Sequence, residues 1–194
     1  MDNTVGSRSD NVGTDPVTTE VNNRNSLEIL SYYTPTSLTK FERNVPEYIT
    51  GYVDGEGCFT VTFNMKPKAL LGWELRPSFS VSQNEDRRQV LDIMKMYFGC
   101  GYIRRDYSDK TVKFEVRDHS DLMRKVIPHF QKYPLLSAKQ KDFELFQRIC
   151  GLVEVKSHLQ KDGFIQILNL AYQMNGSGKR KRKYEEVVRQ LRER

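Results

Sequence analysis

The stretch Tyr48-Ile49-Thr50-Gly51-Tyr52-Val53-Asp54-Gly55-Glu56-Gly57 decides how the rest of the chain can fold. A proline stands two residues before it, and proline suits the first turn of a helix because its missing N–H would have no partner there. Gly51 and Gly55 lie four residues apart, so on a helix they form one bare face that a second backbone could approach closely. Asp54 and Glu56 fall at the helix end, beside glycines that stop it.

Carboxylates are electrostatically unfavourable at the C-terminal end of a helix, because the helix dipole is negative there. Their position suggests a function, and metal binding is the obvious one. Apolar and polar residues alternate directly after Gly57, so a strand follows the helix without a loop. A glycine-rich acidic turn between a helix and a strand is equally well an ordinary turn, and these ten residues alone do not decide between the two interpretations.

The composition predicts one core-forming domain with some excess length, or two small domains. The chain has 194 residues, of which 38% are hydrophobic, with ten Phe and ten Tyr. No apolar run approaches the roughly 20 residues that span a bilayer. The polar, acidic N-terminus argues against a targeting peptide. Three cysteines without paired spacing indicate a reduced compartment, either a prokaryotic cytoplasm or an organelle that encodes the protein.

The charge is spread unevenly along the chain. The net charge is +6, whereas residues 1–40 hold three Lys and Arg against five Asp and Glu, so the remainder carries +8. We expect residues 1–40 to be a disordered extension, from which Leu27–Tyr33 could dock on the domain. A basic domain behind such a leader favours a polyanionic partner, and nucleic acid is the first candidate.

Alternating residues predict four strands in two hairpins, and a helical period predicts the segments around them. Pro77 falls within the second strand and suggests that this strand is an edge strand or is kinked. Each hairpin has one apolar face, so we expect a single antiparallel sheet with helices on that face. The predicted strands are 59–65, 72–83, 100–106 and 111–117, and the predicted helices are 46–55, 84–99, 119–132, 137–152, 162–174 and a last one with Val187, Val188 and Leu191.

The expected fold class is α+β, with the order αββαββα, a four-stranded antiparallel sheet and extra C-terminal helices. Residues 41–175 would form the core, and residues 176–194 would form a basic linker and a C-terminal helix. The basic run Lys179–Lys183 would clamp phosphates that flank a bound site, and a nuclear localisation signal is an alternative interpretation of it.

The second face of the predicted sheet is rich in polar and charged residues. A solvated face gives the same pattern, but a curved polar sheet on a basic protein also fits a DNA major groove, where such side chains match the base edges. We expect DNA contacts from Thr60, Thr62, Asn64, Lys66, Lys68, Glu74, Arg76, Ser78, Ser80, Arg104, Asp106, Thr111, Lys113, Glu115 and, outside the sheet, Lys141.

The residues from Ile49 to Gly57 resemble the signature of the LAGLIDADG homing endonucleases, and the order αββαββα is similar to theirs. The resemblance covers roughly Val45 to Lys183 and includes one copy of the motif. It therefore implies the single-motif branch of the family, whose members work as homodimers with their motif helices packed across the two-fold axis of the dimer. It also implies that the sheet of each chain is saddle-shaped. The implied dimer contacts are Ile49, Thr50, Gly51, Tyr52, Asp54 and Gly55.

The resemblance also implies the catalytic residues. Glu56 matches the acidic metal ligand of the family, although many members have Asp there, and the Gly55 main-chain carbonyl matches its helper, with Mg²⁺ (or Mn²⁺) as cofactor. Gln83, in Ser82–Arg88, matches a residue that positions water. Arg87 matches a group near the cleaved phosphate, and Lys139 matches a lysine that stabilises charge at the reacting centre.

These matches imply a site-specific endonuclease for intron homing, which as a homodimer makes a metal-dependent double-strand break in a long, nearly palindromic DNA target. Two alternatives remain. An RNA maturase would assist the splicing of its intron, with intron RNA as partner, and a non-catalytic regulator would only bind DNA. Glu56, Gln83, Arg87 and Lys139 together favour the nuclease, because a regulator needs none of them. A maturase can keep the whole site, so a dual role stays open.

Overall fold

Helix α2 (Val45–Glu56) begins the part of the chain that the computed structural model describes, which comprises residues 44–107, 111–176, 178, 180 and 182–193. The predicted extension at residues 1–40, with Leu27–Tyr33, lies outside these residues. The Asn44 side chain accepts the N–H of Glu47 at 3.4 Å and caps the helix. The predicted passage from helix to strand is confirmed, because β1 (Gly57–Met65) starts at the next residue.

Gly57 is required at this junction by close packing. A Cβ at this position would lie 2.7 Å from the Val53 carbonyl oxygen, and closer still to the Val53 side chain. Val53 is fully buried and cannot move aside. Any side chain at position 57 would therefore push the helix away from the strand.

The four strands of the described residues form one antiparallel sheet, as the sequence predicts, and the structure gives their order as β1-β2-β4-β3. The others are β2 (Trp73–Asn84), β3 (Tyr102–Asp106) and β4 (Thr111–Val116). β2 lies between β1 and β4, so an edge position for it is wrong. However, β4 pairs with β2 only from Phe79 onward, and at Pro77 the only paired neighbour is β1. A proline is tolerated there because no bond to β4 is lost.

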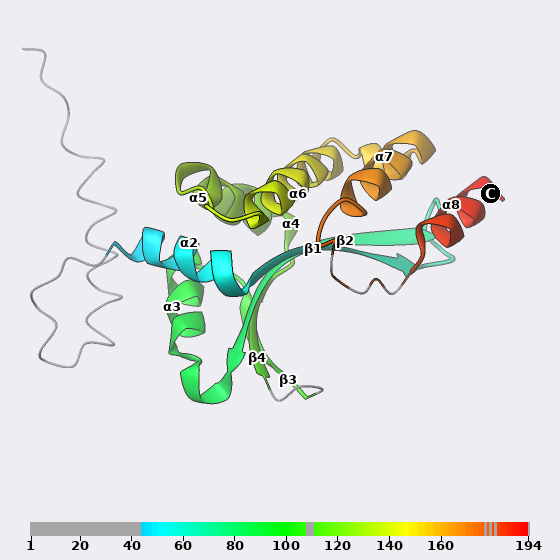
Figure 1. The fold of residues 1–194 in the computed structure, drawn as a ribbon. Helices are drawn as coiled ribbons and strands as arrows, with labels where there is room; N and C mark the ends of the chain where they lie inside the picture. The colour runs from blue at the N-terminus through cyan, green and yellow to red at the C-terminus, as the bar shows by residue number, and fades with distance from the viewer. Residues whose placement is uncertain (1–43, 108–110, 177, 179, 181, 194) are drawn as a thin grey trace, which may run out of the picture. The chain divides into compact units, whose positions relative to one another are not determined.

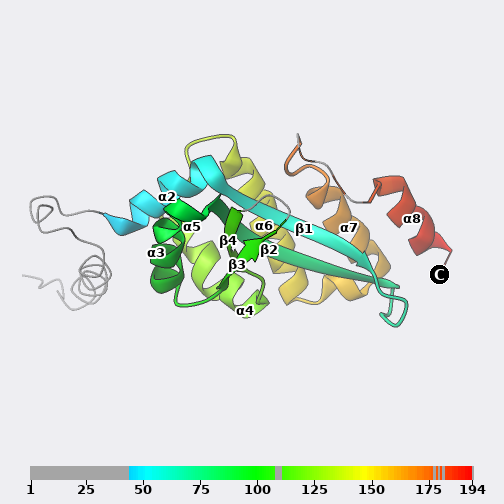
Figure 2. The same cartoon turned by 90° about the horizontal axis from the view of Figure 1, so that it is seen from below.

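Helices cover one face of the sheet (Figure 1), and β3 and β4 curve away from the plane of the longer β1–β2 hairpin. Seen from below, β1 and β2 lie in front of α6 and α7, and none of the described helices covers that second face (Figure 2). The elements are η1 (Glu85–Arg87), α3 (Gln89–Phe98), α4 (His119–Asp121), η2 (Leu122–Val126), α5 (Ile127–Lys132), α6 (Lys139–Glu154), η3 (Ser157–Leu159), α7 (Lys161–Ala171) and α8 (Tyr184–Arg192).

Three details of the helices differ from the prediction. Asn84 belongs to β2 and makes no side-chain cap, so α3 starts later, after a 3₁₀ turn. The helix predicted over 119–132 is present but contains a π turn directly before Pro128, where proline removes a helical hydrogen bond. Met96 falls within the predicted helix, where its position among apolar residues predicts burial, but it is 40% exposed, so that prediction is wrong. None of the described helices is long and apolar enough to cross a membrane.

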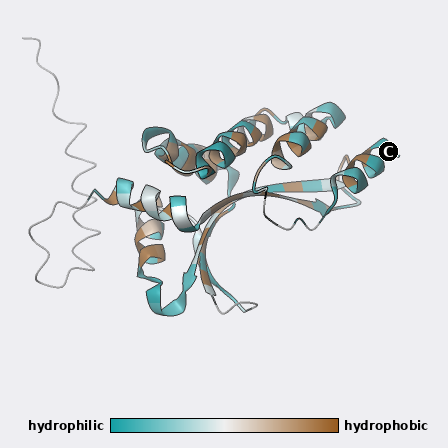
Figure 3. Ribbon diagram, in the orientation of Figure 1, coloured by the Kyte–Doolittle hydropathy of each residue, from teal (hydrophilic) through white to brown (hydrophobic). Residues whose placement is uncertain are grey.

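An aromatic cluster forms the core directly behind the end of α2. The Phe59 ring lies 5.3 Å from Phe79, 5.3 Å from Phe130 and 5.3 Å from Phe146 between centroids, and each of these side chains is fully buried. Burying one such ring contributes about 1.5–3 kcal/mol. In Figure 3 the helices alternate between brown and teal, as helices with one apolar face do. This packing fixes β1, and with it the helix end that precedes β1.

A buried polar cluster ties α2 to α3 and α5. The Thr50 hydroxyl donates to the Tyr133 carbonyl at 3.3 Å, so it accepts from His129 Nε2 at 3.1 Å. His129 Nδ1 then accepts from the Tyr97 hydroxyl at 3.0 Å, which assigns the neutral imidazole. Burial lowers the pKa of His129 from 6.5 to about 4, because a buried imidazolium loses its hydration. Burial likewise raises the pKa of Tyr97 to about 12.

His129 should make the protein less stable in mild acid. The folded protein keeps His129 neutral, whereas the unfolded chain protonates it below about pH 6.5. The free energy of unfolding therefore falls as the pH drops through 6.5, by about 2 kcal/mol at pH 5 from this group, and the loss levels off below about pH 4. Urea unfolding of wild type and His129→Gln between pH 7.5 and 5 measures this.

The glutamine amide can replace both hydrogen bonds of His129 but does not titrate, so His129→Gln should show a shallower pH dependence. All other titrating groups are shared by the two proteins. If the free energy of unfolding depended on pH in the same way in wild type and His129→Gln, the assignment of a neutral, buried His129 would be contradicted.

Candidate active site and nucleic-acid interface

The C-terminal end of α2 brings three candidate groups together. Glu56 is the last residue of the helix and is exposed, as is Gly55. The Lys139 ammonium, at the start of α6, donates to the Val53 carbonyl at 3.0 Å and to the Gly55 carbonyl at 3.3 Å. A cation at the negative end of a helix is electrostatically favourable. The structure thus brings two main-chain carbonyls and a cation together at the helix end that carries the exposed Glu56.

Asp54 positions the loop that delivers Lys139. Its carboxylate accepts the N–H groups of Leu136 at 3.1 Å and Ser137 at 3.0 Å, and the Ser137 hydroxyl at 2.5 Å. The Ser137 oxygen in turn accepts the N–H of Lys139 at 3.1 Å. The assignment of Asp54 to a dimer contact is therefore corrected, because its oxygens bind the loop of its own chain.

Gln83 approaches α2 from the opposite flank, at the end of β2. Its side-chain nitrogen contacts the Tyr52 hydroxyl, and its side-chain oxygen accepts the N–H of Asn84 at 2.7 Å. Arg87 lies farther along, in η1, with a side chain that is 74% exposed and 4.0 Å from Asp86. Within the described part of the chain, Arg87 forms no ion pair or hydrogen bond with the other candidate groups.

One stripe of α2 is left open. Gly51 and Gly55 are exposed, and a Cβ added at either of them would meet no atom within 4 Å. The predicted contacts Ile49 and Thr50 are wrong, because they are 0% and 7% exposed and face the core of their own chain. Tyr52 stays beside the stripe and is half-buried.

Two residues near this stripe were missed by sequence reasoning. Tyr48 is 50% exposed, and its ring lies 6.3 Å from that of Tyr52. Its spacing of three residues from Gly51 is the signal that could have placed it on the stripe. Leu136 is 93% exposed on the loop held by Asp54. No sequence pattern marks it, since its exposure follows from the loop geometry.

Strand register puts the predicted DNA contacts on one face of the sheet. Thr60 pairs with Ser78, Thr62 with Arg76, and Asn64 with Glu74, and directly paired residues share a face. On the other half, Arg104 pairs with Lys113 and Ser80 with Glu115. On β1 these polar residues alternate with buried residues such as Phe59 and Phe63, whose rings contact α6 and α7, so they lie on the face that the described helices leave uncovered.

Charged residues on this face are paired with one another. Glu74 binds Lys66 and Arg76, both at 2.7 Å, and the hydrogen bond from Lys66 is the main cause that lowers the pKa of Glu74. Asp106 lies 3.7 Å from Arg104 and 3.7 Å from Lys113. Such pairs hold long side chains in defined positions along the face.

Three of the predicted DNA contacts are buried and are corrected. Glu115 is 5% exposed and accepts from Tyr102, Arg104 and Arg117 at 2.9–3.1 Å. Burial raises the pKa of Glu115, but these hydrogen bonds outweigh it and hold the pKa below its usual range. Glu115 thus orients two arginines, and it is not itself available to a base. Ser78 and Ser80 are 7% and 9% exposed.

The remaining predicted contacts are accessible to different degrees. Thr62, Lys66, Lys68, Arg76 and, on α6, Lys141 are exposed, whereas Thr60, Asn64, Glu74, Arg104, Asp106, Thr111 and Lys113 are half-buried. The tip of the second hairpin, 108–110, lies outside the described residues.

The basic run before α8 is partly used inside the chain. Arg180 donates to the carbonyls of Ala171 and Met174, and its guanidinium lies 4.6 Å from the centre of the Tyr172 ring. Arg182 binds Glu186 at 2.7 Å. Arg180 thus holds the segment before α8 against the end of α7, whereas Arg182 pairs with a residue of α8 itself. The phosphate clamp stays a prediction for this run. Lys179 and Lys181 lie outside the described residues.

The helix end suits a hard cation with few protein ligands. Among the described residues, no group of three His, Cys, Asp or Glu side chains could hold a metal ion, which excludes a tetrahedral zinc site built from them. Glu56 has no ion pair there, and the neighbouring carbonyls already attract the Lys139 ammonium. Mg²⁺ keeps several waters and takes carboxylate, carbonyl and phosphate oxygens, so Glu56 and the Gly55 carbonyl fit it.

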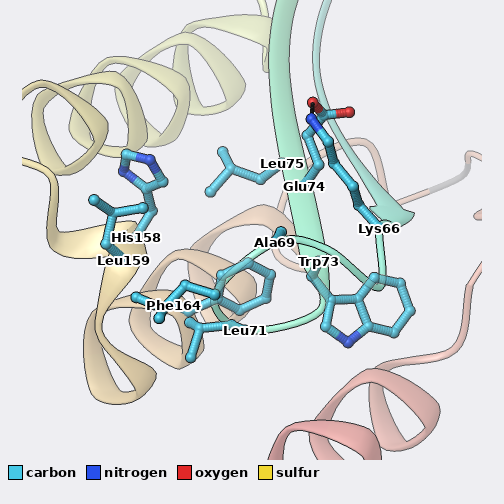
Figure 4. A pocket seen from close by; sticks show the side chains of 10 residues that line it. Lys66, Ala69, Leu71, Trp73, Glu74, Leu75, His158, Leu159 and Phe164 are labelled. Atoms are coloured by element: carbon cyan, nitrogen blue, oxygen red, sulfur yellow. Dashed lines mark hydrogen bonds and ion pairs between the residues drawn. The ribbon is translucent and has the colours of Figure 1, made fainter.

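A separate cavity of about 190 Å³ lies between the β1–β2 loop and α7. Leu71, Leu75 and Phe164 surround it, with His158 beside them (Figure 4). None of the candidate catalytic residues lines it, so it is not part of the site at the end of α2.

A known protein family identifies the class of protein that this fold and site define. The family model described as LAGLIDADG endonuclease matches residues 49–150, which is more than half of the chain. The chain therefore belongs to the LAGLIDADG endonuclease family, and the predicted resemblance is confirmed.

Particular relatives support the same conclusion. "Probable intron-encoded endonuclease 2" of Neurospora crassa is 35% identical over 131 residues, which are 67% of this chain and 29% of that protein. "Homing endonuclease I-ApeII" of Aeropyrum pernix is 26% identical over 149 residues, covering 73% of this chain and 87% of that protein. The chain spans only 29%, 24% and 26% of the first three curated relatives it matches.

Solved structures share the fold. The homing endonuclease I-TnaI is 36% identical with a TM-score of 0.67, covering 76% of this chain and 96% of that one. The LAGLIDADG homing endonuclease I-LtrWI bound to target DNA is 34% identical with a TM-score of 0.66, covering 68% of this chain and 44% of that one. The predicted α+β class and four-stranded antiparallel sheet are thereby confirmed.

Glu115→Gln should destabilise the protein although Glu115 lies on an uncovered face. The substitution removes the charge that binds Arg104 and Arg117, and hydrogen bonds to charged groups contribute roughly 2 kcal/mol. The free energy of unfolding in urea at pH 7.5 should fall by roughly that amount.

Glu74→Gln is the matched control, because Glu74 also binds two cations but is more exposed, and it should change the stability little. Equal effects of the two substitutions would show that Glu115 does not organise the face.

Proposed function

We propose that the protein is a site-specific homing endonuclease that makes a double-strand break in DNA by metal-dependent hydrolysis of phosphodiesters. The observation that carries the proposal is that Glu56, the Gly55 carbonyl and the Lys139 ammonium meet at the end of α2, with Gln83 on the opposite flank of the helix. Membership of the endonuclease family supports it. The three free cysteines fit a reducing compartment.

Each group has a distinct chemical role. A divalent ion held by Glu56 and the Gly55 carbonyl would lower the pKa of water and neutralise charge on the phosphate. Lys139 is held by two carbonyls within reach of that centre, where its charge would stabilise the negative charge that develops on the phosphate oxygens. Gln83 orients water but cannot take its proton, so ordered water must carry the proton away. Arg87 is exposed and could bind a phosphate.

The protein would act as a homodimer. One chain carries one such helix end, whereas a double-strand break requires two, one for each DNA strand. The open stripe of Gly51 and Gly55 lies on the same helix, and an isologous contact through it would set the two helix ends side by side. With that symmetry we expect a long, nearly palindromic target, with one half for each protomer.

The uncovered face of the sheet would bind the DNA. Its exposed cations, among them Lys66, Lys68 and Arg76, can reach phosphates or base edges. The pairing of Arg76 with Glu74 fixes a donor and an acceptor next to each other, and that combination is suited to a base edge in the major groove.

Cutting should require both Mg²⁺ and Glu56. We expect double-strand cuts when the protein is incubated with Mg²⁺ and a duplex library that has a randomised central segment, and none in EDTA. Glu56→Gln should slow cutting of the selected duplex by about 100-fold or more, as expected for losing one stabiliser of the transition state. The affinity of Glu56→Gln for the duplex, measured by electrophoretic mobility shift, should stay within about twofold of wild type, which corresponds to less than 0.5 kcal/mol.

Glu47→Gln, which changes an exposed carboxylate at the other end of α2, should cut like wild type. Binding without a metal-dependent break in any duplex would overturn the endonuclease proposal. Loss of binding in Glu56→Gln would show that Glu56 is structural.

Gly51→Leu should separate the dimer without harming the fold. The added Cβ meets open space in one chain, so the protomer tolerates it, but the side chain would fill the stripe where a second backbone would pack. The dissociation constant of the dimer, measured by sedimentation, should rise roughly ten- to hundredfold, the scale of overpacking an interface.

Gly151→Leu on α6 is the control, because a Cβ there also meets no atom within 4 Å. Equal dimer affinities of the two variants would contradict this interface, and a monomeric wild type would contradict the homodimer itself.

A further inference from the structure

Tyr52 joins the helix that carries Glu56 to the strand that carries Gln83. Its hydroxyl contacts the Gln83 side-chain nitrogen, and both residues are half-buried. Tyr52 precedes Glu56 by one helical turn and follows Gly51 of the open stripe directly. The contact therefore lies between the site at the helix end and the stripe that would meet a second copy.

The chemistry of the neighbours fixes which way the Gln83 amide points. A main-chain N–H can only donate, so the amide oxygen must face Asn84, which it meets at 2.7 Å. The amide nitrogen must then face the Tyr52 oxygen, which accepts from it. A flipped amide would set its nitrogen against the N–H of Asn84, donor against donor. The orientation thus follows from hydrogen bonding and not from an arbitrary choice of amide rotamer.

This orientation decides what Gln83 offers to a substrate. The amide nitrogen carries two hydrogens, of which Tyr52 accepts one, so the second remains for an acceptor such as a phosphate oxygen or a lone pair of water. The amide oxygen is turned to the main chain. Gln83 therefore acts as a hydrogen-bond donor.

We propose that Tyr52 is a positioning residue that holds Gln83 as a hydrogen-bond donor toward the reacting phosphate or water. This inference rests on the proposed endonuclease function and names a further residue for it. The last torsion of a glutamine side chain is broad and has no strong preference of its own. Without the phenol oxygen the amide would rotate more freely and would present its oxygen to the substrate for part of the time.

Tyr52→Phe tests the inference, because it removes only the phenol oxygen. Single-turnover cutting of the selected duplex in Mg²⁺ should slow about three- to tenfold, the scale of one neutral hydrogen bond, with duplex affinity and dimer affinity unchanged. Tyr184→Phe is the control, since it also removes only a phenol oxygen, which here donates to Asn169 between α8 and α7, outside the site and the open stripe. It should cut at the wild-type rate.

If Tyr52 acts only through Gln83, Tyr52→Phe should slow cutting no further in a Gln83→Ala background. A merely structural role of Tyr52 would instead be independent of Gln83. The same loss in both backgrounds, or an unchanged rate in Tyr52→Phe alone, would overturn the inference.

A measurement without cutting separates this inference from the proposed function. In ¹⁵N NMR spectra of the free protein, the Gln83 side-chain amide, assigned by its loss in Gln83→Ala, should be shifted from exposed glutamines and should move toward them in Tyr52→Phe. Gln83 signals that are the same in wild type and Tyr52→Phe would overturn the contact. A wild-type protein that shows the shift but cuts no duplex would count against the endonuclease proposal alone.

Discussion

The passage from α2 to β1 through Gly57 is the constraint on which the rest of the structure depends. The backbone turns from helix to strand where a Cβ would lie 2.7 Å from the Val53 carbonyl oxygen, so the direction of the helix relative to the strand has no freedom. β1 is itself fixed by the Phe59 cluster. The helix end therefore projects from a rigid base, and the groups around it keep their spacing without any contribution from a flexible loop.

Each side of α2 has a different role, so almost every residue of the helix is constrained. Ile49 and Val53 pack into the core, and Thr50 closes the hydrogen bonds around His129. One flank carries Asp54, which places Lys139 through the loop, and the other carries Tyr52 with its contact to Gln83. The remaining stripe is bare. Because these tasks share one rigid element, a change that rotates the helix would disturb the core, the site and the proposed interface together.

The sequence predicted the fold well because period, glycine placement and turn chemistry all act locally. Alternation gave all four strands, and only their ends shifted by one or two residues. It could not give the partners of polar residues that meet across long sequence separations. Thr50 is buried because His129, 79 residues later, donates a hydrogen bond to it, and Glu115 is buried because three donors surround it. A polar residue looks accessible in a strand pattern until such partners are known.

The contact of Lys139 with the carbonyls of α2 has a consequence for how the protein matures. The negative helix end is already balanced by an internal cation. Zinc fingers, in contrast, stay unfolded until their ion arrives. The chain can therefore order this helix end during folding without a bound ion, so the two ligands that we propose for the ion are in place before it binds.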